Sequence, residues 1–303
     1  MRHFWPLLIF LIILLVAIIG LKQDPISKKL STSVPQRIIT LAPNITEVTF
    51  ALGLDNKIVA VTKYCDYPAQ VNTLPKVGGF IDPNLEAIVA LQPDLVILVA
   101  SQQQTIKQLQ QLNIPILAVH NATLADIKDS ISIIGKATDR QQQAEQILNK
   151  IEHQISTISN KVANLNRPKV MLTMGHSTSS EHMKNVYIAG QHDFYNDLIK
   201  LAGGQNSYQN THLKVPSLSI EGIMQLNPDV IIDIFPEASD HNANIEQTIQ
   251  QWQNLTYVNA VKNNRIHIIE QNYATIPGPR IFQLLGDMAR IIHPELNWDE
   301  QTL

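Results

Sequence analysis

The sequence is poor in cysteine, in aromatic residues and in net charge. A single cysteine, Cys65, stands among 303 residues, so no intramolecular disulfide can form. The formal net charge is −3, which argues against a nucleic-acid binder, because such proteins need a basic surface. No Gly-x-Ser-x-Gly elbow, His-Glu-x-x-His site or phosphate-cradling glycine loop is present. These absences argue against an enzyme.

Long apolar runs are also scarce, with one exception at the N-terminus. Residues 4–21 carry no charge, Arg2 precedes them and Lys22 follows. The run exceeds the roughly 7–15 residues of an export-signal core, and Ile18-x-Gly20 is a poor cleavage site. A membrane-spanning helix needs about 17–25 residues. We therefore expect residues 1–23 to be a signal or anchor helix, with an uncleaved anchor favoured.

This N-terminus indicates a location for the rest of the chain. We expect a periplasmic or otherwise extracytoplasmic body, held at the inner membrane by residues 4–21, or secreted if the segment is cleaved. No cysteine lies near residue 20, so a lipoprotein anchor is not expected. A membrane sensor acting through its own chain would need a cytoplasmic module, and only three residues precede the run.

One phrase occurs twice in the sequence. Residues 84–98 and 219–233 both read Glu-x-Ile-x-x-Leu-x-Pro-Asp and continue into an aliphatic run. The apolar spacing predicts a short amphipathic helix, and the run that follows predicts a buried parallel strand at 95–99 and at 230–234. One interpretation is a pair of generic helix–strand units. The other is two lobes with related α/β organisation.

Each copy of the phrase places a glutamate at the start of its helix. Asn84 and Ser219 are favourable N-cap residues, so Glu86 and Glu221 fall in the first turn, where the helix dipole favours an anion. A lone glutamate there would be explained by helix capping. Two equivalent ones also fit a pair of carboxylates offered to a two-fold symmetric partner.

The remaining pattern predicts the domain organisation. Residues 24–36 read as a tether, 37–137 as a first α/β lobe, 138–166 as one long connecting helix and 167–303 as a second α/β lobe. Thr138 or Asp139 could cap the connecting helix, which would be about 40 Å long. The expected fold class is α/β, with two Rossmann-like lobes, each built on a central sheet, joined by a stiff helix. Further strands are expected at 38–43, 57–62, 114–119, 169–174 and 265–270, and helices at 44–52, 102–112, 123–136, 191–202, 245–254 and 279–291.

Several segments resemble those of one known family. The segments are the stretch at 37–53 with Asn44-Ile-Thr-Glu47 as its capped helix start, Tyr64-Cys-Asp-Tyr-Pro68, Val77-Gly-Gly-Phe80, Ala202-Gly-Gly204 and Pro277-Gly-Pro-Arg280. They resemble the substrate-binding proteins of ABC importers for vitamin B12, ferric siderophores and haem, and come nearest to the B12-binding branch. The resemblance covers about residues 36–295 and implies a class III periplasmic binding protein.

The resemblance also implies partners and site residues. In this family one glutamate per lobe docks on the two membrane subunits of the permease, and the matching positions are Glu86 and Glu221. The ligand would lie in the cleft between the lobes, a usual place for α/β ligand sites. We expect it to be a metal-containing chelate, a corrinoid or a ferric siderophore, with haem as a third candidate. No resident cofactor, protein-held metal or nucleic acid is expected.

Five residues are candidates for contacting the ligand. Tyr64 and Phe80 match pocket-facing aromatic positions of the B12-binding branch, and such rings suit a large flat ligand. Asn272, Tyr273 and Arg280 are the second-lobe candidates. Arg280 could meet an anionic group of the ligand or could form a surface salt bridge. Tyr67, beside Pro68, is expected to be structural.

The chain departs from the B12-binding branch at one position. Those members carry a tryptophan after a Val-Pro pair, whereas this chain has Val215-Pro216-Ser217. Its tryptophans, Trp5, Trp252 and Trp298, lie outside the predicted cleft loops. The corrinoid, ferric-siderophore and haem alternatives therefore stay open.

A sulfur- and imidazole-bearing group near 171–183 could in principle hold haem or a metal. Its members are Met171, Met174, His176, His182 and Met183. Met171 and Met174 have opposite strand parity, so they are not expected to face one site. An ordinary polar loop is the favoured interpretation of His176. Cys65 is expected to be a small buried residue rather than a soft ligand.

Overall fold

The computed structural model describes residues 34–175, 185–235 and 245–298. The first lobe holds a parallel four-stranded sheet in the order β2-β1-β3-β4. Its strands are β1 (Ile38–Thr40), β2 (Ile58–Val61), β3 (Leu95–Val99) and β4 (Ile116–Val119). Its helices are α2 (Pro43–Ala51), α3 (Leu85–Ala90), α4 (Gln103–Gln111) and α5 (Leu124–Ala137), with short 3-10 turns η1 (Asp55–Lys57) and η2 (Ala69–Thr73).

The second lobe repeats this arrangement. Its parallel sheet has the order β10-β9-β5-β7. The strands are β5 (Lys169–Thr173), β7 (Gln205–Asn206), β9 (Val230–Ile234) and β10 (Ile266–Ile269), beside a small antiparallel pair, β6 (Val186–Tyr187) and β8 (Ser217–Leu218). The helices are α7 (Phe194–Leu201), α8 (Ile220–Leu226), α9 (Ile245–Gln253), α10 (Asn259–Lys262) and α11 (Ile281–Ile292), with the 3-10 turn η3 (Asn272–Thr275).

The two sheets share one connectivity. In each, the lobe's first strand lies between its second strand and the strand of the repeated phrase, and the last strand pairs with that repeat strand. Thus β1 corresponds to β5 and β3 to β9. The expectation of two related α/β lobes is confirmed.

The repeated phrase folds as the sequence predicts. Asn84 accepts a hydrogen bond from the backbone N–H of Ala87, and Ser219 accepts one from Gly222, so each is the N-cap of its helix. After each helix one residue, Gln92 or Asn227, takes a positive φ of 46° or 42°. This left-handed residue ends the helix immediately before the proline of each copy.

The aspartate of each copy has a structural task that the sequence did not reveal. The Asp94 carboxylate accepts hydrogen bonds from the backbone N–H groups of Gln36 and Arg37, at the start of β1. Asp229 accepts one from Lys169, at the start of β5. Each carboxylate therefore links the start of the repeat strand to the first strand of its own sheet. This shared role accounts for the aspartate in both copies of the phrase.

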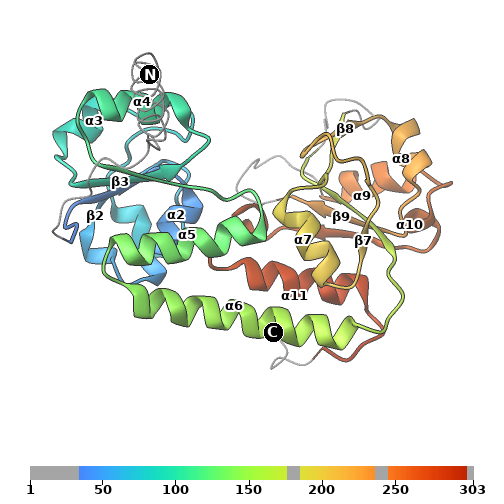
Figure 1. Cartoon of the computed structure of the whole chain (residues 1–303). Coiled ribbons are helices and arrows are strands. Elements are labelled where there is room, and N and C mark those ends of the chain that lie inside the picture. The colour runs from blue at the N-terminus through green and yellow to red at the C-terminus, as the bar shows by residue number, and fades with distance from the viewer. Residues whose placement is uncertain (1–33, 176–184, 236–244, 299–303) are drawn as a thin grey trace, which may run out of the picture. The chain divides into compact units, whose positions relative to one another are not determined.

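Helix α6 (Gln141–Val162) joins the lobes and packs against α5 of the first lobe and α11 of the second (Figure 1). Its 22 residues correspond to about 33 Å, less than expected. The prediction that Thr138 or Asp139 caps this helix is wrong. Thr138 ends α5 and its hydroxyl donates to the Ile134 carbonyl, while Asp139 has φ 57°, so the chain turns before Arg140 starts α6.

The expected cap of the first helix is also wrong. Asn44 lies inside α2, because Pro43 occupies the first turn and Ala42 is the N-cap. Proline suits this position, since its fixed φ matches the helix and its missing N–H would have no partner there.

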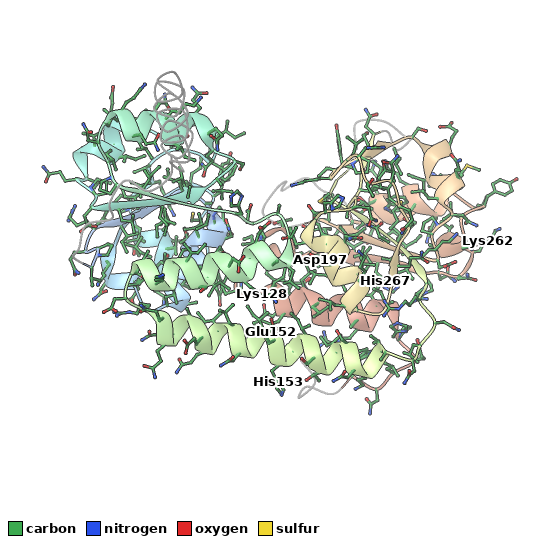
Figure 2. All side chains as sticks on the ribbon, in the orientation of Figure 1. Lys128, Glu152, His153, Asp197, Lys262 and His267 are labelled. Carbon is green, nitrogen blue, oxygen red and sulfur yellow. The ribbon has the colours of Figure 1, made fainter. Side chains whose placement is uncertain are left out.

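Polar contacts also join neighbouring elements near the connector. Lys128 of α5 pairs with Glu152 of α6 at 2.6 Å, on the exposed side of both helices (Figure 2). Asp197 of α7 accepts a hydrogen bond from the backbone N–H of Leu124 at the start of α5, which links the two lobes directly. Such contacts agree with a stiff connection between the lobes.

The predicted anchor, residues 4–21, lies outside the described residues. Among the residues that the structure describes, no helix has both the length and the apolar character needed to cross a membrane.

Candidate functional site

The predicted ligand residues follow strands of the two parallel sheets. Tyr64 lies three residues after β2, and Asn272 lies three residues after β10. The carboxyl ends of parallel strands are where open α/β sheets bind ligands. Both lobes therefore direct candidate side chains to the edge at which such sites form.

Tyr64 and Phe80 lie on adjoining loops of the first lobe. The backbone N–H of Lys63 donates to the Gly78 carbonyl at 2.9 Å, which brings the two loops together. Tyr64 is 57% exposed, with the Lys63 ammonium 5.0 Å from its ring centre. Phe80 is partly buried against the main core, and Gln102 donates a hydrogen bond to its carbonyl. Of the two rings, Tyr64 offers more surface to a ligand.

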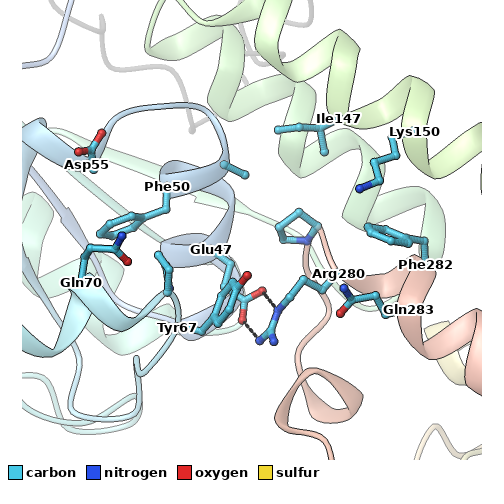
Figure 3. Close-up of a pocket in the computed structure, with 13 residues that line it drawn as sticks. Glu47, Phe50, Asp55, Tyr67, Gln70, Ile147, Lys150, Arg280, Phe282 and Gln283 are labelled. Carbon is cyan, nitrogen blue, oxygen red and sulfur yellow. Dashed lines mark hydrogen bonds and ion pairs between the residues drawn. The ribbon is translucent and has the colours of Figure 1, made fainter. Parts of the chain in front are cut away.

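Arg280 makes a bidentate ion pair across the two lobes. It is the N-cap of α11, and its Nε donates to Glu47 Oε2 at 2.8 Å while its Nη2 donates to Glu47 Oε1 (Figure 3). The side chains of Arg280 and Glu47 are only 12% and 2% exposed. Burial raises the pKa of Glu47, and the hydrogen bonds and charge of Arg280 oppose that shift. The sequence left Arg280 between a ligand role and a surface salt bridge, and the structure shows a buried salt bridge.

Further side chains of both lobes surround this ion pair. The guanidinium carbon of Arg280 lies 3.8 Å from the ring centre of Tyr67, in the first lobe. Its Nη1 donates to Asn272 Oδ1 at 3.0 Å, and Asn272 Nδ2 donates to Asp66 Oδ2 at 3.4 Å. The segment Tyr64–Pro68 therefore meets η3 and Arg280 directly. The ring of Tyr67 thus packs on the Arg280 guanidinium.

Tyr273 is turned toward its own lobe. Its hydroxyl donates to Asp287 Oδ2 of α11, and its ring packs against the main core. Burial and the Asp287 carboxylate raise the pKa of Tyr273. Its ring centre is 5.6 Å from the Arg280 guanidinium. The contacts of Tyr273 are those of a residue that supports Arg280 and η3.

A cavity of about 520 Å³ adjoins the ion pair. Figure 3 shows Glu47, Arg280 and Tyr67 along one border, with Phe50 on one side and Ile147 and Phe282 on the other. Its walls thus come from α2, η1, η2, α6 and α11 and from the residues just before η2 and α11. Arg280 lines this cavity, whereas Tyr64, Phe80, Asn272 and Tyr273 do not.

Sequence reasoning missed Glu47, Asp66 and the partnership of Tyr67 with Arg280. A signal for Glu47 was available. It is the only charged residue between Arg37 and Asp55, and a carboxylate buried in such an uncharged stretch needs a partner. The partner itself could not be read from the sequence, because Arg280 lies 233 positions away.

Glu86 and Glu221 occupy the first turns of α3 and α8, and both are exposed. The hydroxyl of Ser219 lowers the pKa of Glu221, so this carboxyl stays ionised. Neither glutamate forms a salt bridge with any other residue that the structure describes. Both carboxylates are therefore open to solvent in this structure.

The sulfur-bearing candidates belong to the interior. Met171 is fully buried in one core cluster and Met174 packs against another, in agreement with their opposite strand parity. Cys65 is 2% exposed, with its Sγ 3.1 Å from the hydroxyls of Thr46 and Thr62. His176, His182 and Met183 lie outside the described residues.

Comparisons with known proteins agree with this architecture. Residues 38–273 match a family model described as periplasmic binding protein. An ABC transporter substrate-binding lipoprotein of Bacillus subtilis is 27% identical, over 86% of this chain and 81% of its own. A vitamin B12-binding protein of Vibrio parahaemolyticus is 26% identical, over 81% of this chain and 85% of its own. A possible iron-binding, periplasmic solute-binding protein of Staphylococcus epidermidis superposes with a TM-score of 0.71 and 28% identity, over 86% of this chain and all of its own.

Proposed function

The chain belongs to the periplasmic binding protein family, and on that premise we propose that it is the substrate-binding component of an ABC importer. The relatives named as an ABC transporter substrate-binding lipoprotein and as a vitamin B12-binding protein support this proposal over most of their length. The body would work in the periplasm or another extracytoplasmic space, as a carrier and not as an enzyme.

The ligand is a corrinoid or a related metal chelate, bound between the lobes. The observation that carries this proposal is the meeting of the Tyr64–Pro68 loop with Asn272 and Arg280 across the lobes, at the carboxyl ends of strands. A chelate on this edge would contact both lobes at once. The exposed ring of Tyr64 supplies a flat apolar surface, and the Asn272 amide has a second N–H besides the one it donates to Asp66.

A ferric siderophore is the second candidate. Ser217 stands where the B12-binding branch has tryptophan, and the Staphylococcus epidermidis protein is named as possibly iron-binding. Arg280 does not favour an anionic siderophore, because its charge is already neutralised by Glu47. An anionic ligand would have to displace a buried carboxylate, and leaving that charge unpaired is costly.

Calorimetric titration with cyanocobalamin, with ferric siderophores and with haemin decides among these ligands. Binding of cyanocobalamin in the micromolar range or tighter supports the corrinoid. Binding of an iron chelate alone moves the protein to iron acquisition. We expect Tyr64→Ala and Phe80→Ala to weaken the binding, since both rings lie at the proposed site.

Tyr257→Ala is the matched control for the two ring substitutions. Tyr257 is 74% exposed and precedes α10, whose Ala260 hydrogen-bonds to Pro228 at the amino end of β9, opposite the carboxyl ends of the strands. Equal losses for all three variants, or unchanged affinity in Tyr64→Ala and Phe80→Ala, would remove these two rings from the site.

Glu86 and Glu221 are the proposed docking residues for the two membrane subunits of the permease. Their equivalent, exposed places in the two lobes support this role. Glu86→Arg with Glu221→Arg should abolish uptake and leave ligand affinity unchanged, because reversed charges would repel the permease. Glu145→Arg, an exposed change on α6, is the control. Normal uptake by the double variant would refute the docking role.

Attachment of the protein to the membrane through residues 4–21 is a separate proposal. Fractionation of cells together with N-terminal sequencing of the protein tests it. An intact N-terminus in the membrane fraction supports the anchor, and a processed N-terminus in the soluble fraction contradicts it.

A further inference from the structure

Each proposed docking glutamate has an exposed apolar side chain one helical turn further on. Val89 lies three residues after Glu86 in α3 and is 45% exposed, while Met224 lies three residues after Glu221 in α8 and is 42% exposed. Side chains three apart in a helix are neighbours on one face. The two lobes thus present the same pair, a carboxylate beside an apolar group.

Val89 and Met224 do not belong to the core-facing sides of their helices. The inward-facing residues of the two helices, Ile88 and Ile223, are both fully buried. Val89 and Met224 immediately follow them in the chain and therefore point about 100° away around the helix. A single exposed apolar residue is ordinary on a protein surface, but the same exposure at matching positions of both copies calls for a common cause.

The segments leading into both helices add to the apolar surface. Ile81, shortly before α3, is 88% exposed, and Leu213 and Val215, shortly before α8, are 54% and 48% exposed. Figure 1 shows α3 and α8 each on the side of its lobe away from α6. Further exposed apolar residues therefore stand in the segments that lead into the helices of both glutamates.

We propose that Val89 and Met224 are contact residues of the docking interface, and that each permease subunit offers a cation bordered by an apolar pocket. This inference rests on the proposed docking function of Glu86 and Glu221. Two observations select this occupant. The repeated carboxylate needs a positive partner, and its presence in two equivalent lobes needs a partner with two equivalent subunits.

Two other possible partners for these faces would be repelled by the negative charges of Glu86 and Glu221. A second copy of this chain that brought α3 onto α8 would place Glu86 against Glu221. An anionic membrane surface would repel both carboxylates. A cationic, two-fold symmetric protein surface has neither conflict.

The apolar neighbour gives the charged contact a physical advantage. An exposed ion pair is weakened by solvent and salt, so that two glutamates alone would hold a partner poorly. Apolar side chains that close around the pair exclude water and strengthen its attraction. Part of the docking affinity should consequently remain at high salt.

The test uses the permease with which the wild-type protein supports uptake. That permease is reconstituted in lipid nanodiscs, and the affinity of each variant for it is measured. Val89→Ser with Met224→Ser should weaken the complex by about 10- to 100-fold, since two buried apolar contacts are lost. The loss should persist in high salt. Val89→Ile with Met224→Leu should restore affinity, because both keep an apolar group in place.

Leu112→Ser with Ile133→Ser is the matched control. These residues are 47% and 44% exposed and lie on α4's C-terminal end and on α5. Equal weakening by this control would overturn the inference, as would wild-type affinity of the Val89→Ser, Met224→Ser variant. Calorimetric affinity for the transported ligand should be unchanged in all of these variants, and a change would show a folding defect that counts against the inference.

Charge reversal run in parallel separates this inference from the proposed function. If Glu86→Arg with Glu221→Arg abolishes binding while the serine variants bind normally, only the apolar contact is refuted. If the charge-reversed protein binds normally, or no permease supports uptake with the wild-type protein, the docking function and this inference fall together.

Discussion

Breaking the Glu47–Arg280 ion pair on one side only should strongly destabilise the junction between the lobes. In Arg280→Met the Glu47 carboxylate, 2% exposed, would lose a bidentate partner and stay buried. Removing one member of a buried pair costs about 3–5 kcal/mol of the free energy of unfolding. For a protein of this size that corresponds to a fall in melting temperature of roughly 10 °C.

The Lys128–Glu152 pair supplies the control. Its side chains are 33% and 50% exposed, so Lys128→Met should cost less than about 1 kcal/mol. Glu47→Leu combined with Arg280→Met should recover most of the loss, because two apolar residues leave no buried charge behind. Calorimetric or fluorescence-monitored melting of the four proteins measures each step.

The pH dependence provides an independent check on the same variant. Without the arginine, burial and the nearby Asp66 charge act on Glu47 unopposed and raise its pKa further above the ordinary value of 4.5. A raised carboxyl pKa means that stability is lost as pH rises through it and recovered as pH falls. The deficit of Arg280→Met should therefore shrink toward pH 5. A deficit equal to that of Lys128→Met, or one that does not change with pH, would refute the reasoning.

Three further predictions concern the second lobe. Burial raises the pKa of Asp193 from 3.8 to about 6, so its folded carboxyl binds a proton between these values while the unfolded one does not. The free energy of unfolding should then fall by about 3 kcal/mol as pH rises from below 4 to above 6. Asp193→Asn keeps an N-cap residue and should remove this pH dependence, as measured by melting at a series of pH values. Gly203→Ala should destabilise by about 2 kcal/mol or more, because φ is 83° there and the new Cβ would lie 2.5 Å from His293 Nε2. Gly222→Ala, with no heavy atom nearer than 3.5 Å, should instead stabilise α8 by about 0.5–1 kcal/mol, and denaturant melts that rank the two alanines otherwise would contradict this account.

The local elements of this protein were predictable because their signals are local. Apolar runs and spacing placed β3, β9, α4 and α9 within a residue or so of their observed bounds. The capping of α3 and α8 followed from Asn84 and Ser219, since a cap joins residues only three apart. Helix ends were less predictable near residue 138, where Asp139 adopts a left-handed conformation that its residue type permits but does not require.

The sequence alone determined the two-lobed α/β class, the repeat and the exposed places of Glu86 and Glu221, because the repeated phrase encodes both helices and both strands. Only the tertiary structure decided the role of Arg280. Its partner, Glu47, and its neighbour Tyr67 both come from the other lobe, far away in the chain. Such an ion pair depends on how the two sheets are placed in the folded chain. Local sequence propensities do not predict which distant carboxylate a buried guanidinium will pair with.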